Sequence, residues 1–174
     1  MYQLSQLVPI ARFTADPTVL AVRADSPWKN AGEMIEAARK AKVPVIWVVA
    51  DYSNDKIPVP AQARLARQGW TEVCCAPGSW GHDFAGPRPQ AGETVITKHS
   101  FSSFHETALE AELRRRGIET LVIAGVQTNA CVDYAIREGF VRGFYIAVPE
   151  DCVAAHMPDR HAATLNATAK TIRI

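Results

Sequence analysis

Three side chains that can do covalent chemistry stand where apolar runs of the sequence end: Asp25, Lys98 and Cys131. A cysteine thiolate is a nucleophile, and a nearby ammonium favours the thiolate and stabilises a developing negative charge. A carboxylate can take the thiol proton and pass it to a leaving amine. Together these groups would attack a carbonyl carbon and expel an amine. Taken singly, each has a simpler interpretation: a turn-forming aspartate, a solvated lysine and a buried, inert thiol.

The segment around Cys131 favours the nucleophile over the inert thiol. Leu121–Ala124 is an apolar run that predicts a buried strand, Gly125 interrupts it, and Thr128–Asn129 is typical of a helix N-cap. We therefore expect a helix over 129–139 with Cys131 in its first turn. The positive end of the helix dipole favours a thiolate at that position.

Strands and helices must alternate along the chain to position these groups. The strands are continuous apolar runs, which predicts one α/β domain over 1–174, a three-layer Rossmann-like fold with about six parallel strands and helices on both faces. Residues 1–17 show no clear period and are expected to form an N-terminal arm or edge segment. The predicted strands are 18–24, 43–50, 94–98, 119–124, 144–148 and 171–174, and the predicted helices are 31–41, 61–68, 104–116, 129–139 and 159–169.

The fold class places the three chemical groups at one edge of the sheet. Ligands of open parallel sheets bind beyond the C-terminal ends of the strands. Asp25 follows the first predicted strand, Lys98 closes the third and Cys131 follows the fourth. The irregular stretch 51–93 is long enough to line such a site, so Trp80 is a candidate for substrate contact, with simple loop packing as its alternative.

Local signals also predict where one helix begins. Ser103 and Glu106 have the spacing of a capping box, which would open the helix over 104–116.

Composition limits the class of protein. The chain has 174 residues, 48% of them hydrophobic, and a formal net charge of +1. This length suits one domain with a sizeable core, and the charge indicates neither a nucleic-acid nor a membrane-surface partner. No stretch resembles a transmembrane helix or a secretory signal, and the four cysteines match no zinc pattern. We therefore expect a cytoplasmic protein without a cofactor.

Several stretches of the chain carry family motifs in the same order. Segment 94–107 has the pattern of a lysine motif, and segment 113–118 has the pattern of the helix and turn that follow this motif. Segment 122–132 has the pattern of a cysteine motif, and Pro149–Asp151 together with His161 fit a C-terminal pattern. Over roughly 18–174 the chain thus resembles the isochorismatase-like cysteine hydrolase superfamily. Its members include nicotinamidases, carbamoylsarcosine amidases and ureido hydrolases.

The resemblance implies roles for individual residues. Cys131 becomes the nucleophile, Lys98 the lysine of the catalytic triad, and Phe101, the aromatic residue of the lysine motif, a substrate contact. The family commonly has a cis peptide at the position of Val126–Gln127, which would direct backbone N–H groups of Gln127 and Cys131 at an oxyanion.

The same resemblance implies the reaction. Relatives that cleave the isochorismate ether lack the cysteine, so Cys131 indicates cleavage of a C–N bond in a small amide or ureido compound through a thioester. The relatives are often dimers or tetramers, which implies a homo-oligomer. The sequence does not reveal which amide is the substrate.

The first predicted strand departs from the family's Asp-x-Gln motif. Alignment of the apolar run puts Arg23 at the catalytic Asp, Asp25 at the Gln and Trp28 at the usual Phe, whereas a shift of two residues puts Asp25 on the Asp. Side chains 23 and 25 point to the same side of a strand. Asp25 can therefore act as the base, with Arg23 pairing it or binding an anionic substrate and Trp28 lining the pocket. The alternative is a broken triad in a catalytically silent protein that binds a metabolite or a protein partner.

Nicotinamidases in this family also bind a metal through an Asp and histidines after the second strand. Asp51 is present here, but no histidine lies between it and Gly81. We therefore expect no metal, and nicotinamide becomes a less favoured substrate.

Overall fold

The structure is a computed structural model that describes residues 8–12, 19–22, 31–70, 74–84 and 87–172. Strands are β1 (Val8–Arg12), β2 (Val19–Val22), β3 (Ile46–Ala50), β4 (Thr94–Lys98), β5 (Thr120–Val122), β6 (Gly125–Val126), β7 (Tyr145–Ala147) and β8 (Val153–Ala154). Helices are α1 (Ala31–Lys40), α2 (Val59–Gln68), α3 (Leu109–Arg115), α4 (Asp133–Val141) and α5 (Pro158–Ile172). Within these ranges, no helix combines the length and the apolar surface that a membrane crossing requires.

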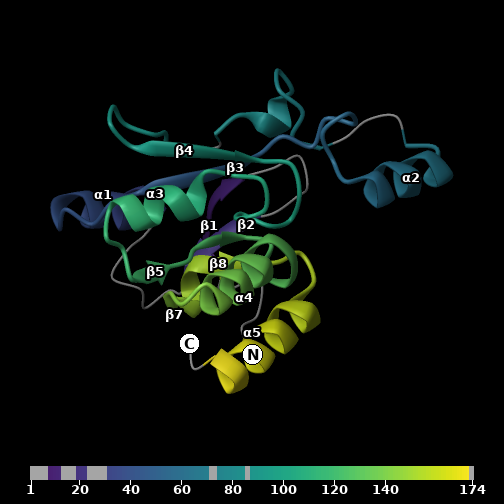
Figure 1. The fold of residues 1–174 in the computed structure, drawn as a ribbon. Helices are drawn as coiled ribbons and strands as arrows, with labels where there is room; N and C mark the ends of the chain where they lie inside the picture. The colour runs from purple at the N-terminus through teal and green to yellow at the C-terminus, as the bar shows by residue number, and fades with distance from the viewer. Residues whose placement is uncertain (1–7, 13–18, 23–30, 71–73, 85–86, 173–174) are drawn as a thin grey trace.

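The strands pair in the way an α/β fold requires. β3 pairs with β4, β5 with β7 and β6 with β8, all in parallel, whereas β1 pairs with β2 in antiparallel. The α/β, Rossmann-like class is therefore confirmed. Figure 1 shows α3 between the β3–β4 pair and the β5–β7 pair, whereas α2 stands apart from the strands and contributes no buried residue.

Two apolar clusters hold the layers together. The first joins α3 to strands β3, β4, β5 and β7; its buried members are Ile96, Phe104, Leu109, Leu113 and Phe144. The second joins α4 to β8 and to partly buried residues of β7 and α5; its buried members are Val132, Ile136 and Val153. Because Val132 directly follows Cys131, the second cluster fixes the turn that carries the thiol.

Ile136 on α4 offers a test of this core. Its side chain is 0% exposed, so replacement by alanine leaves a cavity between α4 and its neighbours. We expect Ile136→Ala to lower the free energy of unfolding, measured by urea denaturation, by roughly 2–5 kcal/mol. The matched control is Val141→Ala on the same helix, where the side chain is 76% exposed and the expected change is within about 0.5 kcal/mol. Equal losses in both variants would show that the packing is misassigned.

The predicted start of the third helix is wrong. The helix begins at Leu109, not at 104, and the predicted capping box does not cap it. The Ser102 hydroxyl instead accepts hydrogen bonds from the N–H groups of Phe104 (3.0 Å) and His105 (2.7 Å), which closes a local turn ahead of the helix. Glu106, in the left-handed region at φ 54°, keeps this segment out of the helix.

The predicted final strand is also wrong, because α5 continues to Ile172. Thr168 is 0% exposed on this helix, and its hydroxyl donates to the carbonyl of Thr164 at 2.8 Å. That bond satisfies a buried polar side chain inside the helix, so Thr168 is compatible with helical structure at this position.

The strand predicted over 119–124 is shorter in the structure, where β5 ends at Val122. Gly125, predicted only to interrupt the strand, begins β6, and its φ of 123° is a conformation that favours glycine. β6 then pairs with β8 and leads directly to the turn that holds Cys131.

Candidate active site

The ends of β3, β4 and β6 meet at the candidate site. The N–H of Asp51, just after β3, donates to the carbonyl of Lys98 at the end of β4 (2.9 Å). The next residue, Tyr52, places its hydroxyl 3.5 Å from Sγ of Cys131. The structure therefore brings the thiol to the rim where β3 and β4 end, as expected for the carboxyl ends of parallel strands.

Cys131 lies in a π-helical turn, Thr128–Val132, that runs into α4. The carbonyl of Gln127 closes this turn by accepting hydrogen bonds from the N–H groups of Ala130 and Val132, both at 3.1 Å. The thiol is half-buried. A short turn of this type at the start of a helix is frequent at functional sites.

The predicted N-cap residues do not cap the helix. No side-chain cap bond is formed at the start of this turn. The Thr128 side chain instead contacts Nδ1 of His161 at 2.8 Å, because α5 packs against the turn. Among the described residues, Oδ1 of Asn129 is buried without a hydrogen-bond partner.

The peptide bond between Val126 and Gln127 is cis, at the position that the family resemblance implies. Val126 pairs with Ala154 of β8. The side-chain oxygen of Gln127 accepts hydrogen bonds from His156, at 2.5 Å from Nδ1 and 3.4 Å from the backbone N–H. Both sides of this peptide are thus held by the segment around β8.

Lys98 is buried, at 4% exposure, so the interpretation as a solvated charge is wrong. Its ammonium donates to the carbonyl of Phe101 at 2.9 Å. The Phe101 ring packs edge-on against Tyr52, with ring centroids 6.4 Å apart, and is 46% exposed. Lys98, Phe101, Tyr52 and Cys131 therefore form one connected group.

Of the other predicted site residues, the structure describes only Trp80. Arg23, Asp25 and Trp28 lie outside the described residues, so the identity of the base stays a prediction. Trp80 is 63% exposed on a short turn, Trp80–His82. Nδ1 of His82 lies 3.1 Å from the carbonyl oxygen of Ala50, which places this turn next to the end of β3.

The neighbourhood of Asp51 does not suit a metal ion. Its carboxylate accepts hydrogen bonds from Ser53 (Oγ, 2.6 Å) and from the ammonium of Lys56 (2.5 Å), which stands where a cation would bind. Burial acts to raise the pKa of Asp51, but the bonds from Lys56 and Ser53 outweigh it and lower the pKa to about 2. In the part of the chain that the structure describes, no three His, Cys, Asp or Glu side chains gather as a metal site.

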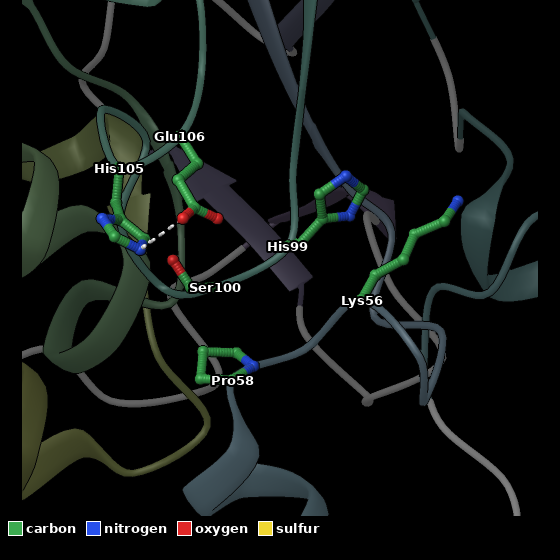
Figure 2. Close-up of a pocket in the computed structure, with 6 residues that line it drawn as sticks. All are labelled: Lys56, Pro58, His99, Ser100, His105 and Glu106. Atoms are coloured by element: carbon green, nitrogen blue, oxygen red, sulfur yellow. Dashed lines mark ion pairs between the residues drawn. The ribbon is translucent and has the colours of Figure 1, made fainter.

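A pocket of about 160 Å³ is lined in part by Ser100, whose carbonyl oxygen lies 3.3 Å from the Tyr52 hydroxyl. Figure 2 shows the residues that line it: Lys56, Pro58, His99, Ser100, His105 and Glu106. In this pocket, Nε2 of His105 lies 3.8 Å from Oε1 of Glu106. The ammonium of Lys56 points away from these two side chains (Figure 2). Nδ1 of His99 donates to the carbonyl of Asp51 at 2.8 Å. The sequence motifs did not single out His99 or Tyr52, although each follows closely on a strand end.

His161, which contacts Thr128 in the turn of Cys131, is expected to make the stability of the protein depend on pH. Burial lowers the pKa of His161, and the charge of Glu150 only partly opposes this effect. The unfolded chain therefore binds a proton more readily than the folded protein, so this contribution to stability is present above about pH 6.5 and is lost as the pH falls. We expect wild-type protein to lose more stability than His161→Gln between pH 7.5 and pH 5.5, by urea denaturation. Parallel losses in the two proteins would contradict this assignment.

Comparison with known proteins identifies the family. Residues 11–173 match the family described as "Isochorismatase domain". The uncharacterized isochorismatase family protein YecD of Escherichia coli O157:H7 is 30% identical over 150 residues, which cover 82% of this chain and 74% of YecD. The ureidoacrylate amidohydrolase RutB of Methylobacterium radiotolerans is 31% identical over 75% of this chain but only 56% of its own length. The chain thus spans little more than half of that relative.

A solved structure agrees with this match. The N-carbamoylsarcosine amidase from Thermoplasma acidophilum superposes with a TM-score of 0.65 at 27% identity, covering 80% of this chain and 76% of that one. The family match, the similar sequences and the similar structure all indicate the same family, and the chain belongs to the isochorismatase family.

Proposed function

We propose that this protein is a cysteine hydrolase that cleaves the C–N bond of a small amide or ureido compound. The observation that supports it most is the position of Cys131, half-buried in the first turn of a helix and connected through Tyr52 and Phe101 to the buried ammonium of Lys98. RutB acts on ureidoacrylate and the Thermoplasma relative on N-carbamoylsarcosine, by their names, and both substrates carry such a bond.

The proposed reaction has two stages. Cys131 attacks the carbonyl carbon, and its proton passes to the carboxylate of Asp25 and then to the leaving nitrogen. The C–N bond breaks, an amine or ammonia leaves and a thioester remains on Sγ. Water then attacks the thioester, releases the acid (a carbamic acid for a ureido substrate) and restores the thiol.

Charge stabilisation accompanies the attack. The carbonyl oxygen becomes negative, and the backbone N–H groups of Gln127 and Cys131 would bind it. The ammonium of Lys98 favours the thiolate before the attack. Arg23, Trp28, Phe101 and Trp80 are the proposed substrate contacts. A cytoplasmic location and a homo-oligomeric assembly also stay predictions.

A panel of small amides and ureido acids tests the proposal through the release of ammonia. We expect at least one compound to be hydrolysed by the wild type and not by Cys131→Ser. Hydroxylamine added during turnover should divert the thioester to a hydroxamate. No ammonia above the Cys131→Ser control across the panel would contradict the proposed hydrolase.

Thiol labelling tests the alternative, a catalytically silent protein with Arg23 at the usual Asp position. An electrophile applied well below the free-thiol pKa of about 8.5 should label Cys131 ahead of Cys74, Cys75 and Cys152 in an enzyme. Equally slow labelling of all four thiols would favour the silent protein that binds a metabolite or partner.

A further inference from the structure

The hydroxyl of Tyr52 lies between two hydrogen-bond partners at the candidate site. It is 3.5 Å from Sγ of Cys131 and 3.3 Å from the carbonyl oxygen of Ser100. The ring is half-buried and is held edge-on by Phe101, at a centroid distance of 6.4 Å. The hydroxyl therefore has a defined position, and only the direction of its single hydrogen is free to change.

That hydrogen has two possible acceptors, and the protonation state of the thiol decides between them. A carbonyl oxygen can only accept, so while Cys131 is a thiol the Tyr52 O–H donates to Ser100 and its oxygen can accept from S–H. Once the thiol has lost its proton, the sulfur carries a full charge and is the stronger acceptor. Rotation about the C–O bond then turns the hydrogen to the sulfur without any movement of the ring.

Tyr52 is suited to donate and not to act as a base. Burial raises the pKa of its phenol far above the ordinary value, and the charges and hydrogen bond of Cys131, with the charges of Cys75 and Cys74, raise it further. The phenol thus keeps its proton at physiological pH. Other titratable groups lie on the adjoining elements of the described chain. Asp51 precedes Tyr52 and is bonded through its carbonyl to His99, and Asp133 begins α4. Lys98 is bonded to the Phe101 carbonyl, and His161 is bonded to Thr128 in the turn of Cys131.

We propose that Tyr52 is a further catalytic residue, whose hydroxyl donates a hydrogen bond to the Cys131 thiolate and holds the sulfur at the rim of strands β3 and β4. This inference rests on the proposed function, because it assigns a partner to the same nucleophile. The hydrogen bond stabilises the charged form of the nucleophile before substrate arrives.

The test compares Tyr52→Phe with Tyr134→Phe across a range of pH. Both substitutions remove one hydroxyl and keep the ring. Tyr134 belongs to the same aromatic group, with its ring 6.0 Å from Phe101, and is 47% exposed on α4. Alkylation of Cys131 by iodoacetamide is followed from pH 5.5 to 9.5 on the peptide that contains it, so that Cys74, Cys75 and Cys152 do not contribute to the signal.

We expect Tyr52→Phe to alkylate about tenfold more slowly at neutral pH, with the midpoint of its pH profile about one unit higher. Tyr134→Phe should follow the wild-type profile. The difference should vanish at high pH, where the Cys131 thiol is ionised in both proteins, and a merely structural role would not produce that convergence. A Tyr52→Phe profile that overlays the wild type, in protein with an unchanged melting temperature, would overturn the proposal.

Substrate turnover separates this proposal from the proposed hydrolase. If a substrate is found, kcat/KM of Tyr52→Phe should fall about tenfold below the midpoint and recover above it. If the amide panel yields no turnover, the alkylation profiles still decide the role of Tyr52, because they require only the thiol. A shifted profile without turnover would mean that the thiolate is stabilised for another reaction.

Discussion

Replacement of Cys131 by serine will lower the proposed amide hydrolysis by about 10³-fold or more. A hydroxyl in this position lacks a thiolate's nucleophilicity, and loss of a nucleophile is among the largest single effects in enzymes. The measurement is kcat/KM from ammonia release on the best compound of the panel. Since serine differs from cysteine by one atom, we expect an unchanged melting temperature.

The matched control is Cys152→Ala. Cys152 is 1% exposed, and burial, followed by the charge and hydrogen bond of Asp151, raises the pKa of its thiol to about 12. It should therefore be unreactive, and its removal should leave kcat/KM within about twofold of the wild type. A larger loss in Cys152→Ala than in Cys131→Ser would mean that the nucleophile is misassigned.

Lys98→Met will be the second largest loss, about 10²-fold in kcat/KM. Methionine keeps the length and most of the volume of the side chain but removes the buried ammonium, which is the positive charge proposed to favour the thiolate. The bond to the Phe101 carbonyl is lost as well, so the edge-on ring against Tyr52 is less firmly held. The pH profile of Cys131 alkylation should move upward together with the loss of turnover.

Lys40→Met provides the comparison for this variant. Lys40 is exposed in the last turn of α1, so the same substitution there removes a solvated charge. We expect turnover and alkylation of this variant to match those of the wild type. If the pH profile of Cys131 alkylation in Lys98→Met is the same as in the wild type, the ammonium does not favour the thiolate, whatever the effect of the substitution on turnover.

The local patterns of the chain predicted the architecture well. Continuous apolar runs such as Ile46–Ala50 and Leu121–Ile123 recur between helical stretches, and that alternation predicts the parallel pairing that the structure shows. The expected burial of these strands on both faces is wrong, because Val95 on β4 is 44% exposed and Val122 on β5 is 63% exposed. The position of Cys131 directly after such a run followed from the same reasoning. The pairing and the position of Cys131 could be predicted because they depend on residue patterns over a few neighbouring positions.

Element boundaries were less predictable, since they depend on competing local bonds. Ser103 and Glu106 have the spacing of a capping box, yet Ser102 closes a turn first and the helix starts at Leu109. The last residues of the chain have β-branched types that suit a strand, whereas α5 continues through 171–172. In each case two local structures suit the sequence, and packing against the rest of the protein selects one.

The sequence by itself determined the alternation of strands and helices, the family motifs and the placement of Lys98 and Cys131 after apolar runs. Only the tertiary structure showed that Lys98 is buried, that His161 contacts the turn of Cys131, and that Tyr52 reaches a sulfur 79 positions away. The reason is physical. Propensity and periodicity act between near neighbours, whereas the environment of a reactive group is set by side chains that meet when distant strands pair.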